Sequence, residues 1–374
     1  MTKNASLGLA LSLLFSQPAC SSGGATGSAG NGGAGGSGGQ TAAAGVSGTS
    51  NAGAGATGHA GTGGVGGGVG TSGAGGAIGD AGNGGNAGAA GFSGTSGGGS
   101  GGSAGAPPNT AWVGTWAAAP QSGGDSYQDK TLRQIVHTSI AGTAARVQLS
   151  NAFGTKAVQV SDVHLAKRTS GSSVDTASDR AVMFGGKASF SIPAGGVALS
   201  DSIDFAVTAL SDVAVSIYLA NSSGSNTYHQ QGTQTNYVAS GDVAGNKDLQ
   251  NPTTIGSYYL LANLDVKNAA ALGAVATLGA SITDGVASNQ DANKRWPNDL
   301  AVRLNMAGSV VGVLNQGISG NTLLHDGAGQ SAINRFTRDV LNQPDIKWVI
   351  VSDDPINDLG EGSGRPTGAQ LIAG

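Results

Sequence analysis

A long glycine-rich tract limits how much of this 374-residue chain can fold. Residues 21–108 consist mostly of Gly, Ala, Ser, Thr and Asn, and the whole chain contains 68 Gly and only 11% charged residues. Such a segment buries too little apolar surface to offset the conformational entropy that folding costs. We therefore expect residues 21–108 to be a disordered linker, whose ends would lie roughly 50 Å apart as a flexible coil.

The first twenty residues have the composition of an export signal. Lys3 precedes an apolar run at residues 5–15 (ASLGLALSLLF), and the sole cysteine, Cys20, follows that run. A short basic start, an apolar core and a cleavage site describe a secretory signal peptide. The position of Cys20 resembles that of the lipidated first residue of bacterial lipoproteins. We expect residues 1–20 to direct export, with the protein either anchored to the bacterial membrane through a lipid on Cys20 or secreted to the cell surface.

Charge and cysteine content exclude several other classes of protein. The formal net charge is −4 at pH 7, so there is no basic surplus to attract a nucleic acid. A single cysteine permits neither an internal disulfide nor a multi-cysteine metal site. No apolar run approaches the ~18 residues that span a bilayer.

The first folded part of the chain has the pattern of short β-strands. Apolar and polar side chains alternate at residues 146–149 and again at 213–219. Clusters of turn-forming residues, such as 151–154, separate these runs. Short alternating strands at this spacing are typical of a β-sandwich. We therefore expect residues 109–265 to form a β-rich, sandwich-like domain.

The pattern changes in residues 266–374. Three near-continuous apolar runs alternate with two amphipathic segments: expected strands at residues 274–278, 310–314 and 348–351, and expected helices at 297–306 and 328–341. Strands with a helix between each pair are βαβ units, which imply a parallel sheet. Near-continuous apolar strands agree, because the strands of such a sheet are buried on both faces.

A polar turn follows each of these three strands. The turns are residues 279–285 (GASITDG), 315–321 (NQGISGN) and 353–358 (DDPIND). The carboxyl ends of parallel strands meet at one edge of a sheet, where reactive groups collect. A serine on a tight strand-to-helix turn exposes its hydroxyl beside free backbone N–H groups. Donors from the three turns could surround one developing oxyanion.

With these blocks the chain resembles the SGNH (GDSL-type) serine hydrolases, in a subgroup of bacterial and fungal members that carry a preceding β-rich region. The segments WVGTWAAAPQ, TLRQIVHTSI, RVQLSNAFG, GASITDG, NQGISGNTLLHDG and WVIV…IND carry the likeness, which covers nearly everything from residue 112 onward. The resemblance implies that residues 266–374 are the N-terminal part of an SGNH hydrolase domain. The implied fold there is a partial, truncated flavodoxin-like parallel sheet.

The resemblance also implies an activity and a set of roles. Ser281 would attack the carbonyl of a carboxylic ester. The backbone N–H groups of Ser281 and Gly320 and the side chain of Asn357 would form the oxyanion hole. The substrate would be a small-molecule or polysaccharide ester, with an acetyl or short-chain acyl group on carbohydrate or lipid, and no cofactor would be needed.

The sequence departs from that family at the catalytic base. The family supplies a histidine in an Asp-x-x-His block near the C-terminus, whereas the last histidine here is His325, upstream of the third strand. Ala280 stands where the family has Asp, and Pro355 where it has Gly. A serine without its base loses most of its rate. We therefore expect a truncated copy that is inactive or nearly so, or alternatively a catalytically dead, tethered surface or carbohydrate-binding protein.

The other titratable residues have structural interpretations. The histidines of the β-rich region are expected at the surface or at an interface: His137, His164 and His229. His325 is expected in a turn, with a local hydrogen bond to Asp326. Asp284 and Asp358 are expected to cap turns or helix N-termini. No His pair has the helical spacing of a metal site.

Overall fold

The computed structural model describes residues 111–360 and 365–374, which belong to one compact unit, Thr95–Gly374. These residues contain nineteen strands, five α-helices and one π-helical segment. The predicted signal at residues 1–20, the lipid anchor on Cys20 and the linker at 21–108 lie outside the described residues. In the described part of the chain, no helix has the length and apolarity to cross a bilayer.

Antiparallel sheets dominate the molecule. A four-stranded sheet has the order β1 (Trp112–Ala117), β16 (Leu261–Lys267), β4 (Ala145–Ser150), β10 (Val197–Leu199). A seven-stranded sheet has the order β14 (Thr253–Ile255), β13 (Asn236–Ser240), β3 (Lys130–His137), β11 (Asp212–Leu219), β6 (Asp162–Ser170), β7 (Ser173–Val174), with β8 (Arg180–Ala181) paired to β6. Two small sheets complete this region: β15 (Tyr258–Tyr259), β12 (Asn226–His229), β2 (Gln121–Gly124), and β5 (Val158–Val160) with β9 (Phe190–Ile192).

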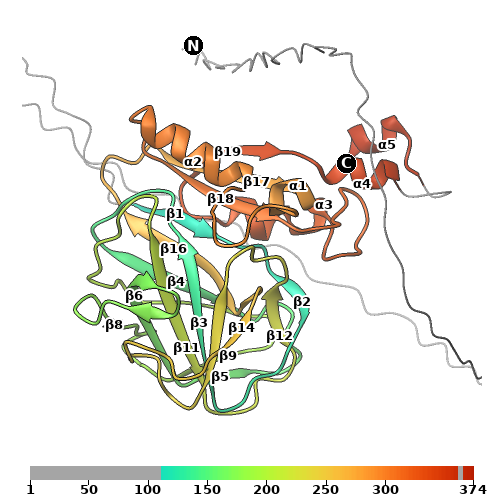
Figure 1. Ribbon diagram of the computed structural model, residues 1–374. Helices are drawn as coiled ribbons and strands as arrows, with labels where there is room; N and C mark the ends of the chain where they lie inside the picture. Colours follow the sequence, from blue (N-terminus) through green and yellow to red (C-terminus); the bar gives the residue numbers. More distant parts are fainter. Residues whose placement is uncertain (1–110, 361–364) are drawn as a thin grey trace, which may run out of the picture. The chain divides into compact units, whose positions relative to one another are not determined.

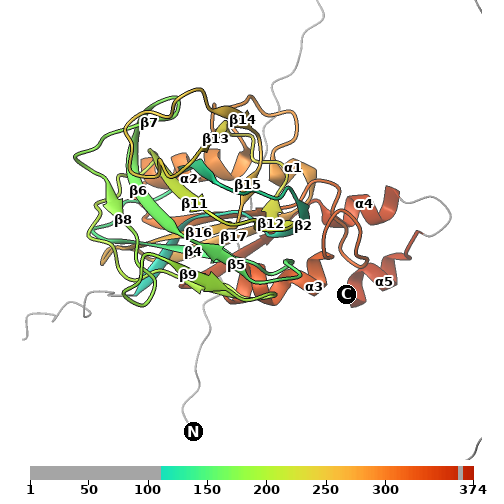
Figure 2. The same ribbon diagram turned by 90° about the horizontal axis from the view of Figure 1, so that it is seen from below.

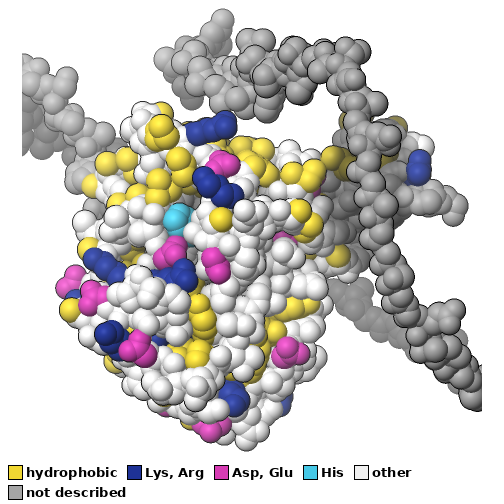
Figure 3. All heavy atoms as spheres, viewed as in Figure 1, with side chains coloured by type: hydrophobic (Ala, Val, Ile, Leu, Met, Phe, Trp, Pro, Cys, Tyr) yellow, Lys and Arg dark blue, Asp and Glu magenta, His cyan; other side chains and the backbone are white. Residues whose placement is uncertain are grey.

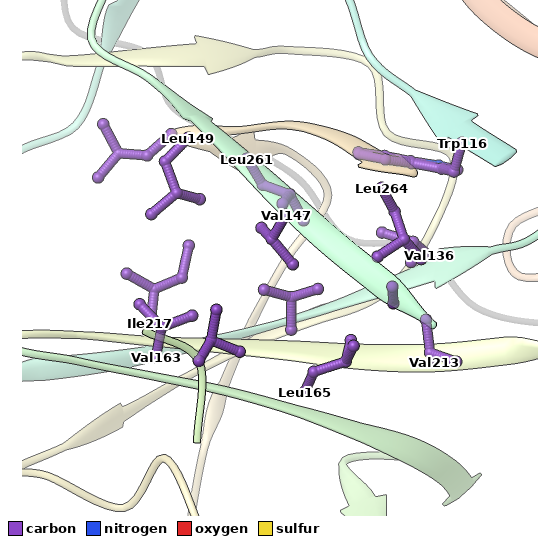
Figure 4. Close-up of a cluster of buried hydrophobic side chains, with 14 of the residues drawn as sticks. Trp116, Val136, Val147, Leu149, Val163, Leu165, Val213, Ile217, Leu261 and Leu264 are labelled. Carbon is purple, nitrogen blue, oxygen red and sulfur yellow. The ribbon is translucent and has the colours of Figure 1, made fainter. Parts of the chain in front are cut away.

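The main hydrophobic core lies between the two large sheets (Figure 4). Val147 and Leu149 of β4 meet Val213 and Ile217 of β11 in one cluster, and all four are at most 1% exposed. The alternation in residues 146–149 follows from this packing, because successive side chains of a strand point to opposite faces.

One small sheet is parallel. It has three strands, in the order β18 (Val311–Gly317), β17 (Gly273–Gly279), β19 (Ile346–Val351). Helix α2 (Trp296–Met306) packs through Leu300 and Leu304 on one cluster of this sheet. Helix α3 (Ala332–Phe336) and the π-helical segment η1 (Thr337–Leu341) pack on another. Helix α1 (Ser281–Asp284) follows β17 directly.

The prediction of a partial flavodoxin-like sheet, as a truncated SGNH hydrolase fold, is wrong for this chain. The described residues form a β-rich molecule in which most strands pair antiparallel, and parallel pairing stops at three strands. After β19 the chain forms α4 (Asp354–Gly360) and α5 (Gly368–Ala373) (Figure 2). Two βαβ-like units in a sequence establish local parallel pairing, but they do not establish how the rest of the chain pairs.

Strand β1 joins the antiparallel region to the parallel sheet (Figure 1). A Cβ at Gly312 would lie 2.0 Å from the carbonyl oxygen of Gly114, so only glycine permits this approach. The amide of Val313 also donates to Ser139 Oγ, at 3.0 Å. The predicted boundary between residues 109–265 and 266–374 falls inside β16 (Leu261–Lys267).

Strand β19 forms an exposed edge. Among the described residues it pairs with β17 alone. Trp348 is 48% exposed and Val351 is 50% exposed, although both belong to an apolar strand. Hydrophobic side chains gather in Figure 3 on the upper part of the face, where Figure 1 draws α2 and β19.

A buried guanidinium stabilises the antiparallel region. Arg133 of β3 is fully buried, and its Nε donates to Ser216 Oγ at 2.9 Å. Its Nη atoms donate to carbonyl oxygens of Ser172, Val243, Ala244, Asn246 and Lys247. Burial lowers the pKa of Arg133 to about 10, which leaves it charged at neutral pH.

We expect Arg133→Met to lower the free energy of unfolding by at least about 2 kcal/mol, because buried carbonyl oxygens would lose their donors. Denaturant unfolding of the purified chain measures this loss. Arg303→Met on the exposed face of α2 is the matched control and should change stability little. Equal stability of the two variants would contradict the proposed role of Arg133.

Candidate active site

Ser281 is the first residue of α1, immediately after β17. Its side chain is half-buried, and its hydroxyl makes no hydrogen bond to a described residue. Gly285 ends this single turn with a φ of 100°, and its amide donates to the Ser281 carbonyl at 2.9 Å. The Ser281 hydroxyl is therefore carried on a short, sharply terminated turn at the end of the central parallel strand.

A carboxylate from the third turn caps this helix. Ala280 occupies the N-cap position and has no side-chain acceptor. Asp353 replaces it: its Oδ1 accepts from the Ala280 amide at 3.0 Å, and its Oδ2 accepts from the Ile282 amide at 2.7 Å. Thr283 Oγ1 donates to the same carboxylate at 2.6 Å. A negative charge at a helix N-terminus is also favourable to the helix dipole.

The second turn is hydrogen-bonded to the first. The Ile318 amide donates to the Gly279 carbonyl at 3.0 Å, and the Ser319 amide donates to Asp284 Oδ2 at 2.7 Å. Gly320 follows with a φ of 78° and is exposed. A positive φ of this kind favours glycine, which fits the residue found here.

The third turn reaches the second through Asn357 and Asp358 of α4. Asn357 Nδ2 donates to the Asn321 carbonyl at 2.7 Å. The Asp358 carboxylate accepts from the amides of Leu323 and Leu324, at 2.6 and 3.1 Å. The structure therefore brings the turns of Ser281, Gly320 and Asn357 side by side, while their catalytic roles stay predictions.

The amides of Ser281 and Gly320 are among the backbone donors of these turns that have no acceptor in the described structure. Within the described residues, the amides of Ser281 and Gly320 donate to no acceptor, although the neighbouring amides of Ala280, Ile282 and Ser319 all do. Asn357 Nδ2 uses one of its two hydrogens. Each of the three turns thus carries an N–H group that has no acceptor among the described residues.

A buried histidine–aspartate pair links β12 to α1. His229 of β12 and Asp284 are 4% and 1% exposed, and His229 Nε2 lies 3.1 Å from Asp284 Oδ1. His229 Nε2 also faces the Gln231 carbonyl, and Nδ1 faces the Ala119 carbonyl. Each ring nitrogen therefore faces protein oxygen atoms, and neither is hydrogen-bonded to the Ser281 hydroxyl. His229 was expected at the surface or at an interface, but it is buried inside one compact unit, and its pairing with Asp284 was not foreseen.

Two other described histidines, His164 and His137, also lie beside carboxylates. His164 lies between Asp162 and Asp179, and its hydrogen bond to Asp162 is the main cause that raises its pKa to about 9. His137 Nδ1 lies 2.7 Å from Asp212 Oδ1. His325 is exposed in a turn, as expected. The expected bond from His325 to Asp326 is not found, because Asp326 accepts from the Ser331 amide and from Asn334 instead.

The adjacent carboxylates Asp353 and Asp354 have different partners. Asp353 caps α1, whereas Asp354 Oδ1 lies 3.4 Å from Nη2 of the fully buried Arg335. Asp354 Oδ2 has no partner among the described residues. Burial is the main cause that raises the pKa of Asp354 to about 6. Arg335 itself was missed in the sequence, because an arginine on an amphipathic helix predicts a solvent-exposed face.

No group of three His, Cys, Asp or Glu side chains within residues 111–360 and 365–374 is placed to hold a metal ion.

Comparison with known proteins gives matches among solved structures alone. No protein-family model matches the chain, and no curated protein does. A family two carbohydrate esterase from Cellvibrio japonicus is 13% identical with a TM-score of 0.20, over 70% of this chain and 71% of that one.

Two further structures come from a family two carbohydrate esterase of Clostridium thermocellum. One, in complex with cellohexaose, is 10% identical with a TM-score of 0.21, over 68% of this chain and 64% of that one. The other is an active site mutant, also 10% identical with a TM-score of 0.21, over 68% of this chain and 63% of that one. This chain thus spans less than two thirds of the Clostridium thermocellum chains. All three similar structures are carbohydrate esterases, and TM-scores of this size carry no argument about the fold or activity of this chain.

Asp353→Asn should destabilise the turn that carries Ser281. The new Nδ2 donor would face the Ile282 amide, so one acceptor is lost and two donors meet. We expect a loss of about 1–2 kcal/mol in the free energy of unfolding, the range for a lost helix cap. Denaturant unfolding measures it, with the exposed Asp204→Asn as control. A loss no larger than that of the control would contradict the capping role.

Asp354 should give stability a dependence on pH. Its pKa in the folded chain, about 6, lies above the ordinary value of 3.8, so the folded state holds the proton more tightly. Its contribution to stability is therefore largest below about pH 4 and falls as pH rises to about 6.

Asp354→Asn mimics the protonated side chain. Between about pH 4 and 6 we expect the free energy of unfolding of the wild type to fall relative to that of this variant. Denaturant unfolding at several pH values measures the difference, with Asp204→Asn again as control. A wild-type-minus-variant difference that stays constant with pH would show that Asp354 is not responsible.

Proposed function

We propose that this chain is a carboxylic ester hydrolase in which Ser281 attacks the ester carbonyl. The observation that carries the proposal is the pair of unoccupied amides at Ser281 and Gly320, set among neighbouring amides that are all hydrogen-bonded. Together with the second hydrogen of Asn357 Nδ2, they supply the donors that a tetrahedral oxyanion requires. The substrate class is an acetyl or short-chain acyl ester on a carbohydrate or a lipid.

In the proposed reaction, Ser281 and the donors of the three turns have separate roles. The Ser281 oxygen would form a bond to the carbonyl carbon while its hydroxyl proton passes to solvent water and the carbonyl oxygen takes up negative charge. The donors of the three turns would stabilise that charge until the C–O bond to the leaving group breaks, and the departing oxygen would take a proton from water to leave as the alcohol. An acyl-serine would then remain, for water to hydrolyse.

Activation of Ser281 is the weak element of this site. Its hydroxyl has no hydrogen bond to a described residue, and both ring nitrogens of His229 already face acceptors. Without a base, the oxyanion hole and binding leave a residual acceleration of about 10³–10⁴ over water. We therefore propose a slow serine nucleophile in the chain as it stands.

Carbohydrate binding without catalysis has less support. Sugar-binding platforms use exposed aromatic rings. In the β-rich region Trp116, Tyr237 and Tyr258 are at most 9% exposed and belong to the hydrophobic clusters. Tyr127 and Tyr228 pack against the same core.

A fluorophosphonate probe tests the proposal. We expect slow, stoichiometric labelling that peptide mass spectrometry locates at Ser281 and that Ser281→Ala abolishes. Ser288→Ala, seven residues along the chain, is the control and should label normally. Asn357→Ala should slow labelling by roughly a hundredfold, because an oxyanion donor is lost.

Two results would contradict the ester hydrolase. One is an absence of labelling in the folded wild type, and retention of that protein on a polysaccharide column would then favour the non-catalytic alternative. The other is labelling that persists in Ser281→Ala, which would locate the reactive group elsewhere.

A further inference from the structure

The three turns share a single buried side chain. Arg335 of α3 is fully buried on the inner side of the turns. Its Nη2 donates to the Gly279 carbonyl at 3.1 Å, at the end of β17. Its Nη1 donates to the Gln316 carbonyl at 2.5 Å, near the end of β18. One planar group therefore contacts the ends of two parallel strands.

The same guanidinium is also linked, through Asn321, to the proposed oxyanion donors. Its Nε donates to Asn321 Oδ1 at 3.0 Å, and Asn321 is the residue after Gly320. The Asn321 carbonyl in turn accepts the Asn357 side chain. A continuous path of two hydrogen bonds thus leads from Arg335 to a proposed oxyanion donor.

Two carboxylates compensate the buried charge. Asp339 lies on the next turn of the same helical segment, 3.4 Å from Nη1, and Asp354 follows β19, 3.4 Å from Nη2. With these partners all five N–H donors of Arg335 have an acceptor. A lysine has three donors on one atom, so it cannot reproduce this fork.

We propose that Arg335 is a positioning residue of the active site, which fixes the turns of Ser281, Gly320 and Asn357 relative to one another; this inference rests on the proposed ester hydrolase. Arg335 touches no substrate. It acts through Gly279, which leads into the Ser281 turn, and through Asn321. A shift of about 1 Å between nucleophile and donors is enough to cost about 100-fold in rate.

Labelling kinetics separate positioning from stability. A variant that merely unfolds in part lowers the fraction of chains that become labelled. A variant whose turns are misplaced is labelled to completion with a smaller rate constant. We expect Arg335→Lys to lower the rate constant at saturating fluorophosphonate about 10- to 100-fold, with the labelled fraction unchanged.

Arg133→Lys is the matched control. Arg133 is also fully buried and also donates to several backbone carbonyl oxygens, but it lies in the antiparallel region. We expect this variant to lose stability and to keep the wild-type labelling rate constant. Equal slowing in both variants would overturn the inference, because the effect would then be general destabilisation.

A second pair of variants tests the inference even if Arg335→Lys does not fold. Asn321→Ala removes the acceptor of Arg335 Nε, whereas Asn321→Asp keeps an acceptor oxygen there. We expect Asn321→Ala to slow labelling and Asn321→Asp to recover part of the rate constant. Wild-type kinetics in Arg335→Lys or in Asn321→Ala would overturn the positioning role and leave the ester hydrolase standing. A folded wild type that is never labelled would overturn both.

Discussion

The contact between β1 and β18 holds the two kinds of sheet together. A three-stranded parallel sheet has little apolar area of its own, and β1 provides it with a partner that is also hydrogen-bonded to β16. The approach is so close that a methyl group at Gly312 would overlap the Gly114 carbonyl. Two glycines, 198 positions apart in the chain, therefore determine whether the parallel strands can lie on the antiparallel core.

Beyond that contact, carboxylates arrange the candidate site. Asp353 of the third turn accepts amides of the first, and Asp284 of the first accepts an amide of the second. Asp358 of the third turn accepts the amides of Leu323 and Leu324, which follow the second turn. Carboxylates of the first and third turns thus fix the neighbouring turns, and each of these bonds consumes a backbone donor. These carboxylates leave the amides of Ser281 and Gly320 without an acceptor among the described residues.

Local structure could be predicted from the sequence where a single periodic pattern determines it. The apolar run at residues 274–278 is part of β17, and Pro297 with Leu300 and Leu304 predicted α2. The helix expected at 328–341 begins later, at Ala332, because Ser331 accepts the Asn334 amide and caps it there. The parallel pairing of the three strands was expected as well, and it carries the three polar turns to one edge.

Long-range pairing could not be predicted in the same way. His229 and Asp284 are 55 positions apart, and Asp353 lies 73 positions from the Ala280 amide that it accepts. Nothing in the local pattern of either partner indicates the other. The predicted fold class was wrong for a related reason: a motif resemblance extended two local βαβ units to a whole architecture, whereas most strands of the described residues pair antiparallel.

The exposed edge of β19 bears on how the protein behaves in solution. Four consecutive apolar residues, from Trp348 to Val351, offer water both their side chains and an unpaired row of backbone groups in the described structure. Such an edge adds any extended peptide as a further strand. Within the described structure, this strand is therefore a place where two molecules can pair edge to edge.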